Sequence, residues 1–188
     1  MALKATIFKA ELQIADMDRN YYHDHALTLA RHPSETDERM MVRLLAYALH
    51  ASEFLAFGKG LSADDEPDLW QKDLTGAIDL WIDVGLPDEK RIRRACGRAR
   101  HVVIYNYGVH GAAIWWDQNA GKLARCGNLS VVSVPAAASQ ALAKLARRNM
   151  QLHCTIQEQQ LWLGDTEDRV QVDLATVKSP STDGNSRR

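Results

Sequence analysis

The chain has 188 residues, of which 46% are hydrophobic and 25% are charged. This length and mixture are typical of a globular protein that buries one large core. A formal net charge of −1 excludes a strong overall attraction to nucleic acid or to an acidic membrane, so any such contact would come from a local cluster.

Membrane segments, targeting signals and cysteines indicate the cellular compartment that we expect for this protein. No apolar run is long enough to cross a membrane, and the N-terminus lacks the pattern of a secretory signal. The three cysteines, Cys96, Cys126 and Cys154, form no CxxC pair, which argues against a disulfide framework and a structural zinc site. We therefore expect a reduced, cytoplasmic, monomeric protein without a membrane partner.

Hydrophobic periodicity and turn residues predict strands and helices that alternate along the chain. The expected strands cover residues 3–16, 21–30, 55–61, 68–73, 77–85, 101–108, 128–134, 151–163 and 169–177. The expected helices cover residues 34–54, 88–100, 110–123 and 135–149. No repeat or linker interrupts them, so we expect a single α/β domain over residues 1–178. Residues 179–188 are polar and predict a disordered tail.

The strand predicted at 77–85 has two different faces, because side chains alternate across a strand. One face is apolar (Ile78, Leu80, Ile82 and Val84) and the other carries Asp79, Trp81 and Asp83. The polar face suggests a strand that lines a cleft, where carboxylates hold a metal ion or act on a proton. The alternative is a half-exposed strand with solvated acids, since alternation alone is common.

The elements around this strand follow the order helix, strand, strand, strand, helix, strand. Glu38 lies on the first helix, Glu66-Pro67-Asp68 opens the second strand, and Ile82-Asp83-Val84-Gly85 ends the third. An aspartate after a proline, followed by an acid on the next strand, resembles the PD-(D/E)xK signature of restriction-endonuclease-like nucleases. This resemblance implies a restriction-endonuclease-like core with added N-terminal and C-terminal strands, and a metal-dependent phosphodiesterase.

The sequence as a whole resembles the bacterial YaeQ family from residue 1 to about residue 177. The stretches that carry this resemblance are Ala2-Leu3-Lys4-Ala5-Thr6-Ile7, Leu29-Ala30-Arg31-His32-Pro33-Ser34-Glu35-Thr36, Ile78-Asp79-Leu80-Trp81 and Gly85-Leu86-Pro87-Asp88-Glu89. The family is regarded as a variant of the nuclease fold with no settled biochemical function. The resemblance therefore implies the fold more strongly than any activity.

Strand geometry indicates which acids can meet. Asp79 and Asp83 lie about 13 Å apart at about 3.3 Å per residue, too far to bind one metal together. If Leu74-Thr75 forms the hairpin loop, Asp68 opposes Trp81 and lies diagonal to both aspartates, about 7 Å away. The same register sets Glu66 against Asp83 and Lys72 against Ala77.

This register predicts a possible Mg²⁺ site on Asp68 and Asp83. Mg²⁺ needs only one or two carboxylates, with water and phosphate completing its shell. Glu38 could supply a third oxygen or hold a metal-bound water. We expect three further residues to support this metal site, namely Glu66, Lys72 and Asp79.

The signature lacks its last residue, because Gly85 stands where the family has a lysine that orients the attacking water. Lys90 in the following helix, or Lys72 across the hairpin, could restore the charge. The implied catalytic set is Glu38, Asp68, Asp83 and Lys90. The alternative is a non-catalytic module that binds nucleic acid or protein and keeps the fold.

A basic cluster lies on the helix predicted at 88–100. Arg91, Arg94 and Arg98 share one face of it and could grip the phosphates of DNA or RNA. The alternative is a solvated helix face, which the net charge of −1 favours.

Overall fold

The computed structural model describes residues 4–181 of the chain. These residues form two compact units, each assembled from separate stretches of sequence. The first unit takes the chain up to His50 together with Pro135–Asp173, and the second takes Ala51–Val134 and the chain from Leu174 onward. Within the described residues, no helix combines the length and the apolar character that crossing a membrane requires.

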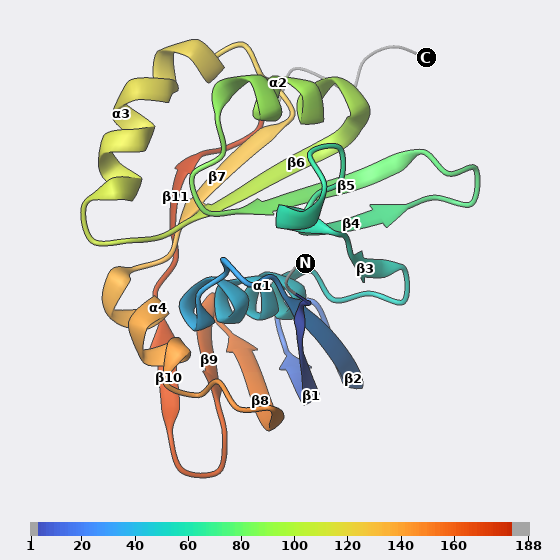
Figure 1. Ribbon diagram of the computed structural model, residues 1–188, viewed down its shortest axis with the longest axis vertical. Helices are drawn as coiled ribbons and strands as arrows, with labels where there is room; N and C mark the ends of the chain where they lie inside the picture. The colour runs from blue at the N-terminus through green and yellow to red at the C-terminus, as the bar shows by residue number, and fades with distance from the viewer. Residues whose placement is uncertain (1–3, 182–188) are drawn as a thin grey trace. The chain divides into compact units, whose positions relative to one another are not determined.

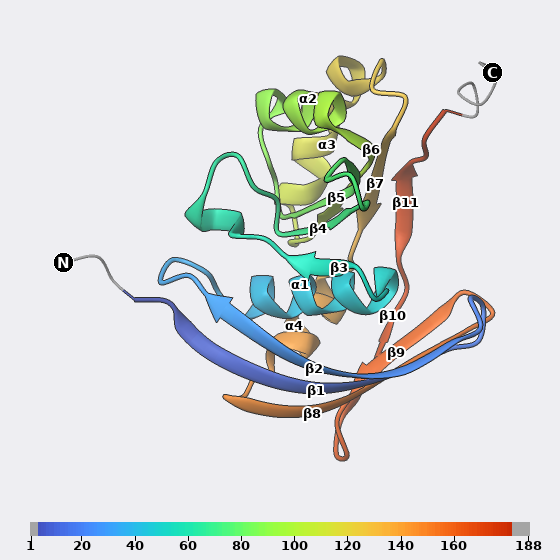
Figure 2. The same cartoon turned by 90° about the vertical axis from the view of Figure 1, so that its right-hand side faces the viewer.

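The first unit is built on a five-stranded mixed sheet in the order β10-β9-β8-β1-β2. Its strands are β1 (Thr6–Asp16), β2 (Tyr21–Arg31), β8 (Asn149–Gln157), β9 (Gln160–Gly164) and β10 (Arg169–Val172). Strand β1 runs parallel to β8, and the other pairs are antiparallel. The helices α1 (Asp37–His50) and α4 (Ala136–Ala143) lie on one face of this curved sheet (Figure 2).

Alternation along β1 explains why this sheet has one covered face. Phe8, Ala10, Leu12 and Ile14 are buried, and the residues between them are exposed. A strand with one apolar face must pack that face against another layer. Helix α1 supplies that layer, since every residue from Met40 to Ala48 is buried.

The second unit is built on a six-stranded mixed sheet in the order β11-β7-β6-β5-β4-β3. Its strands are β3 (Leu55–Phe57), β4 (Leu69–Lys72), β5 (Ile78–Val84), β6 (Ala99–Asn106), β7 (Leu129–Ser133) and β11 (Ala175–Lys178). A short 3₁₀ turn, η1 (Gly60–Ser62), lies between β3 and β4. Strands β5, β6 and β7 are parallel, and the other pairs are antiparallel.

Two helices connect the parallel strands of the second unit, α2 (Glu89–Arg98) and α3 (Gly111–Leu123) (Figure 1). They share one apolar core with the sheet, to which Ile92 of α2, Trp115 of α3 and Ile104 of β6 contribute. Helix α2 begins where the sequence predicts, because the Asp88 side chain accepts a hydrogen bond from the backbone N–H of Arg91.

The predicted α/β class is confirmed, with two mixed sheets and four α-helices among the described residues. The predicted strand at 151–163 is wrong, because the chain turns back between β8 and β9. Glu158 and Gln159 have φ of 52° and 63°, and their N–H groups both donate to the Asp18 carboxylate. That carboxylate, from a loop far away in sequence, stabilises a left-handed turn that local patterning does not reveal.

The predicted strand at 169–177 is also wrong as one element. Strand β10 pairs with β9 in the first unit, and β11 pairs with β7 in the second. The predicted domain over residues 1–178 stays a prediction. Of the predicted tail, residues 179–181 are described, and the N–H of Ser181 donates to the carbonyl of Gly127 at 2.8 Å. Residues 182–188 lie outside the described part of the chain.

Candidate functional site

The hairpin of β4 and β5 brings Asp68 and Asp83 to the same end of two paired strands. Leu69 pairs with Ile82 and Trp70 with Trp81, so the predicted register, with Asp68 opposite Trp81, is wrong by two residues. The reasons are the turn and a bulge between Gln71 and Lys72, each of which shifts the register by one residue. The Asp73 carboxylate accepts hydrogen bonds from the N–H groups of Thr75 and Ala77, which organises a five-residue loop in place of the predicted two-residue loop.

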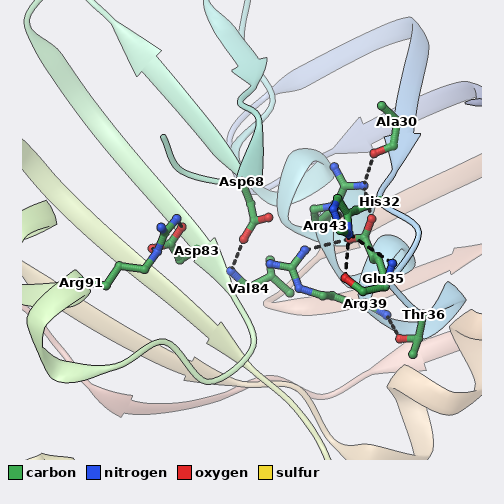
Figure 3. Close-up of polar contacts among 11 residues, drawn as sticks. Ala30, His32, Glu35, Thr36, Arg39, Arg43, Asp68, Asp83, Val84 and Arg91 are labelled. Atoms are coloured by element: carbon green, nitrogen blue, oxygen red, sulfur yellow. Dashed lines mark hydrogen bonds and ion pairs between the residues drawn. The ribbon is translucent and has the colours of Figure 1, made fainter. Parts of the chain in front are cut away.

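Asp83 is a buried carboxylate that an arginine holds at both oxygens. Arg91 Nε donates to Asp83 Oδ2 at 2.8 Å, and Arg91 Nη2 donates to Oδ1 at 2.9 Å (Figure 3). Trp81 Nε1 donates to the same Oδ2 at 3.0 Å, so these side chains share a face as predicted. Only 2% of the Asp83 surface is exposed. The hydrogen bonds to Asp83 raise the pKa of Arg91, although burial acts in the opposite direction.

Asp68 is equally buried and bonds to the backbone. Its Oδ2 accepts the N–H of Val84 at 2.8 Å, as the close-up shows (Figure 3). Gly60 lies on the other side of this carboxylate with φ of 50°, and a Cβ at this position would approach Asp68 Oδ1 to 2.5 Å. The chain of η1 therefore packs directly against Asp68, and only glycine fits there.

Gly85, the residue at the lysine position of the signature, follows directly on β5. Its φ is 104°, in the region where non-glycine residues are strained. Its N–H donates to the carbonyl of Tyr105 at 2.8 Å, which fixes the backbone against β6. A lysine at this position would be strained in this backbone conformation.

The side chains of Asp79, Glu66 and Lys72 bind other groups, although the Glu66 carbonyl shares Arg91 Nη2 with Asp83. Asp79 accepts from Arg100 at 2.7 Å, Glu66 accepts the N–H of Lys59, and the Lys72 ammonium lies 3.7 Å from the centre of the Trp70 ring. Lys90 is exposed on α2. Glu38 belongs to the first unit, where its Oε1 accepts the hydroxyl of Ser139 on α4 at 2.6 Å.

Arg91, Arg94 and Arg98 share one face of α2 as predicted, and we call this face the arginine row. The three side chains donate to backbone carbonyls of residues 64–66, in the loop before β4. Arg91 Nη2 reaches Glu66 at 2.8 Å, Arg94 Nη1 reaches Asp64 at 3.5 Å, and Arg98 Nη1 reaches Asp65 at 2.9 Å. The predicted role of the row in nucleic-acid binding stays a prediction.

Sequence reasoning missed a buried ion-pair network in the first unit. Arg43 donates to both oxygens of Glu35, at 2.7 and 2.8 Å, and Arg39 donates to Oε1 at 2.8 Å (Figure 3). A signal exists in the sequence, because Arg43 is a charged residue inside an otherwise apolar helical run. The structure also shows where the first predicted helix begins. The Thr36 hydroxyl accepts the N–H of Arg39 and caps α1 at its N-terminus.

Another buried polar residue is Asn106, which ends β6. It is fully buried, and its Oδ1 accepts the hydroxyl of Ser133 at 2.5 Å. Its Nδ2 has no hydrogen-bond partner within the described part of the chain. Nothing in the local sequence distinguishes this residue from an ordinary strand end.

The nuclease resemblance implies a divalent metal held by these carboxylates. Among the residues that the structure describes, no three histidine, cysteine, aspartate or glutamate side chains are grouped so that they could hold a metal ion. Both oxygens of Asp83 already accept hydrogen bonds from a cation. A Mg²⁺ ion at Asp83 would therefore compete with Arg91 for these oxygens.

The fold and the hairpin define an α/β protein with two mixed sheets and a buried acid–arginine pair at the end of β5. The family model described as YaeQ protein matches residues 1–174. The chain belongs to the YaeQ family.

Relatives and solved structures agree with this assignment. Two relatives, from Salmonella typhi and Escherichia coli (strain K12), bear the name "Uncharacterized protein YaeQ". They are 49% and 48% identical over 181 residues, which cover 96% of this chain and 100% of each relative. The crystal structure of YaeQ protein from Xanthomonas axonopodis pv. citri matches 94% of this chain and 99% of its own, with 49% identity and a TM-score of 0.90. The structure from Pseudomonas syringae matches 93% and 97%, with 36% identity and a TM-score of 0.89.

Proposed function

We propose that this protein is a non-catalytic descendant of the PD-(D/E)xK nuclease fold whose function is to bind a protein partner. The order α1, β3, β4, β5, α2, β6 along the chain supports the link to that fold. The positions of Asp68 just before β4 and of Asp83 near the end of β5 support it as well.

The contact between Arg91 and Asp83 carries the proposal. In the nuclease signature the second acid binds the metal, whereas here a guanidinium from α2 engages both of its oxygens. A divalent cation at these oxygens would lie beside a fixed positive charge. A metal ion that binds these oxygens would therefore have to displace Arg91.

The conformation at Gly85 supports the same conclusion. The signature lysine cannot occupy a backbone position with φ of 104° without strain. Lys90 is exposed and Lys72 lies on the Trp70 ring, so neither contacts Asp83. The positive charge beside this acid is therefore the Arg91 guanidinium and not a lysine ammonium.

The arginine row favours a protein partner over a nucleic acid. Its guanidinium groups donate to carbonyls of residues 64–66, and these bonds would have to break before phosphates could take their place. The net charge of −1 adds no overall attraction for a polyanion.

A second candidate function is Mg²⁺-dependent cleavage of DNA or RNA. One observation favours it, namely that the pairing of Leu69 with Ile82 brings Asp68 and Asp83 to adjacent strand ends. This candidate requires Arg91 to leave Asp83 when substrate and metal bind.

A nuclease assay separates the two candidates. The purified full chain is incubated with Mg²⁺ or Mn²⁺ and labelled single-stranded DNA, duplex DNA or RNA. We expect no cleavage above that of Asp68→Asn and Asp83→Asn. Metal-dependent cleavage that both substitutions abolish and Asp79→Asn preserves would establish the nuclease. Asp79 is the matched control, because it lies on the same strand and pairs with Arg100.

Binding measurements test the partner class. We expect no fluorescence anisotropy change with the same nucleic acids at low salt. Binding that weakens when the arginine row is changed to glutamine would favour a nucleic-acid partner. Crosslinking in cells should identify a protein that binds the purified chain in isothermal titration calorimetry. If no candidate forms a complex from purified components, the protein-binding proposal fails.

A further inference from the structure

Strand β2 is the outermost strand on one side of the sheet in the first unit (Figure 1). It covers 11 residues and pairs with β1 in one unbroken register from Tyr21 to Arg31. A long edge strand offers its outer row of N–H and C=O groups to another strand, and proteins usually block such an edge with a bulge, a proline or a lysine. Strand β2 contains none of these. The proposed function does not use this edge.

The hydrogen bonds of β1 show which backbone groups of β2 point outward. The N–H of Lys9 donates to the carbonyl of Arg148 at 2.8 Å, on the side of β8. The N–H of Met17 donates to the carbonyl of Ile156 at the same distance. Odd-numbered residues of β1 therefore face β8, and its even-numbered residues face β2. Each even-numbered residue of β1 pairs with an odd-numbered residue of β2, so the even-numbered residues of β2 direct their N–H and C=O groups away from β1.

The outward residues of β2 form an exposed row. All five have exposed side chains, namely Tyr22, Asp24, Ala26, Thr28 and Ala30. Arg43 Nη2 donates to the carbonyl of Ala30 at 3.2 Å, which agrees with an outward direction at this position. Within the described residues, no backbone group of another segment bonds to this outer edge. The row is therefore open to a further strand.

We propose that a second copy of this chain pairs with this edge, β2 against β2 in antiparallel order, around a twofold axis at Ala26. Asp24 then faces the partner's Thr28, and Tyr22 faces the partner's Ala30. Outward residues meet outward residues in every pair, as the hydrogen-bonded pairs of an antiparallel ladder require. A twofold axis makes one surface complementary to itself. The alternative state is the monomer expected from the sequence.

Exposed apolar side chains beside the edge support this register. Ile7 pairs with Ala30 on the outer face of the sheet, so the order across the joined strands is Ile7, Ala30 and the partner's Tyr22. Ile7 is 46% exposed and Tyr22 is 54% exposed. Their Cα atoms would lie about 10 Å apart, with only the small side chain of alanine between them. The tyrosine ring can lean over that alanine, so the two apolar side chains cover one another.

Charges beside the edge also favour Ala26 as the centre. Lys9 pairs with Thr28, so the partner's Asp24 lies one strand beyond Thr28 and within reach of the lysine ammonium. The twofold axis repeats this contact. Centring the axis on Asp24 instead would oppose two aspartates, which is destabilising. The net charge of −1 adds little repulsion between two copies.

Sedimentation equilibrium on the full chain tests the dimer. The measured mass should rise with protein concentration toward twice that of the 188-residue chain. Ala26→Pro removes an outward N–H without touching the ladder to β1, so it should keep the fold and give a monomer. Ala26→Thr retains the N–H and is the matched control, which should dimerise. A monomeric mass of the parent at every concentration would overturn the proposal and leave the edge to an extended segment of another protein.

Charge reversal tests the register. Asp24→Lys places two lysines near one another on both sides of the axis, so it should raise the dissociation constant of the dimer about tenfold. Lys9→Asp should have a similar effect, and the two substitutions together should restore the affinity. A dimer that Ala26→Pro leaves intact, or a loss that the double variant does not reverse, would contradict this pairing. Circular dichroism establishes that each variant is folded.

Amide exchange followed by NMR locates the contact. The N–H groups of Asp24, Ala26 and Thr28 should exchange more slowly as the protein concentration rises. The odd-numbered neighbours bond to β1 and should be protected at every concentration. A dimer in which the three outward amides exchange as fast as in the dilute protein would place the contact elsewhere and would also overturn the proposal.

Discussion

Single charged side chains decide much of this structure at the residue scale, because each buried charge needs a partner of opposite sign. Asp83 pairs with Arg91, Glu35 with Arg43, and Asp16 with Arg19. In each pair the carboxylate is almost fully buried. Such pairs fix neighbouring elements in one arrangement, and the loss of one member leaves the other desolvated without compensation.

We predict that Asp83→Asn destabilises the protein, by about 3 kcal/mol in the free energy of unfolding. The value falls at the low end of the range for buried pairs, because 22% of the Arg91 side chain is exposed. Urea denaturation measures it. Asp79→Asn, which disrupts a pair with a 64% exposed arginine, should cost less than about 1 kcal/mol. Equal or higher stability of Asp83→Asn would indicate that the acids repel one another in a cleft.

We also predict that stability falls in mild acid because of His50. Burial, with the nearby charge of Arg19, lowers its pKa from 6.5 to about 4. Above pH 6.5 neither state is protonated. Between pH 6.5 and 4 the unfolded state takes up a proton that the folded state does not, so the free energy of unfolding falls by up to about 1.4 kcal/mol per pH unit.

Thermal melts across this range test the assignment to His50. His50→Asn should flatten the pH dependence but leave a smaller slope, because burial also lowers the pKa of His25. If parent and variant lose stability equally between pH 6.5 and 4, His50 is not the cause.

At the scale of elements, α2 connects the site to the loop before β4. Its apolar residues Ile92 and Ala95 are buried in the core, and its arginine row holds the carbonyls of residues 64–66. The helix therefore positions both the partner of Asp83 and the segment that leads into Asp68.

We predict that Arg94→Gln with Arg98→Gln loosens residues 60–67 without unfolding α2. Two of the bonds that hold this loop are lost, while Arg91 keeps its contacts with Asp83. Hydrogen exchange should accelerate in this segment by tenfold or more, which corresponds to about 1.4 kcal/mol. Arg93→Gln is the control, because Arg93 contacts Glu89 and Lys122 instead. Unchanged exchange in the double variant would show that the loop is held by other contacts.

Two glycines of the second unit should respond in opposite directions to alanine. Gly60→Ala adds a Cβ 2.5 Å from Asp68 Oδ1 at a φ of 50°, and we expect a loss of about 2 kcal/mol. Gly97→Ala in α2 meets open space, and we expect a gain of about 0.5–1 kcal/mol from helix propensity. Chemical denaturation of both variants compares them. A neutral Gly60→Ala would mean that η1 can move away from Asp68.

At the scale of the whole molecule, some paired strands lie far apart in the sequence and some strands adjacent in the sequence belong to different sheets. Strand β1 pairs in parallel with β8, joining Lys9 to Asn149 across most of the sequence. Strands β10 and β11 are separated by Asp173 and Leu174 alone, yet they complete different sheets. Both sheets therefore depend on strand pairs that are distant in sequence, a feature associated with slow folding.

The sequence by itself determined the class, the order of most elements and the buried face of β1, whereas the face of β5 that carries Trp81 and Asp83 was expected to line a cleft and is buried. Alternation in β1 and the cap at Asp88 are local signals, because they depend on periodicity and on side chains a few residues apart. The arginine row was correctly placed on one face of α2 for the same reason.

Only the tertiary structure decided which distant residues contact those faces. The register of β4 and β5 depends on a bulge and on the Asp73 turn, the reversal at Glu158 depends on Asp18, and the partner of Asp83 comes from the next helix. Periodicity shows which side of an element a residue occupies. It carries no information about which distant group lies opposite, and at Asp83 that group is an arginine where the nuclease signature would have a metal ion.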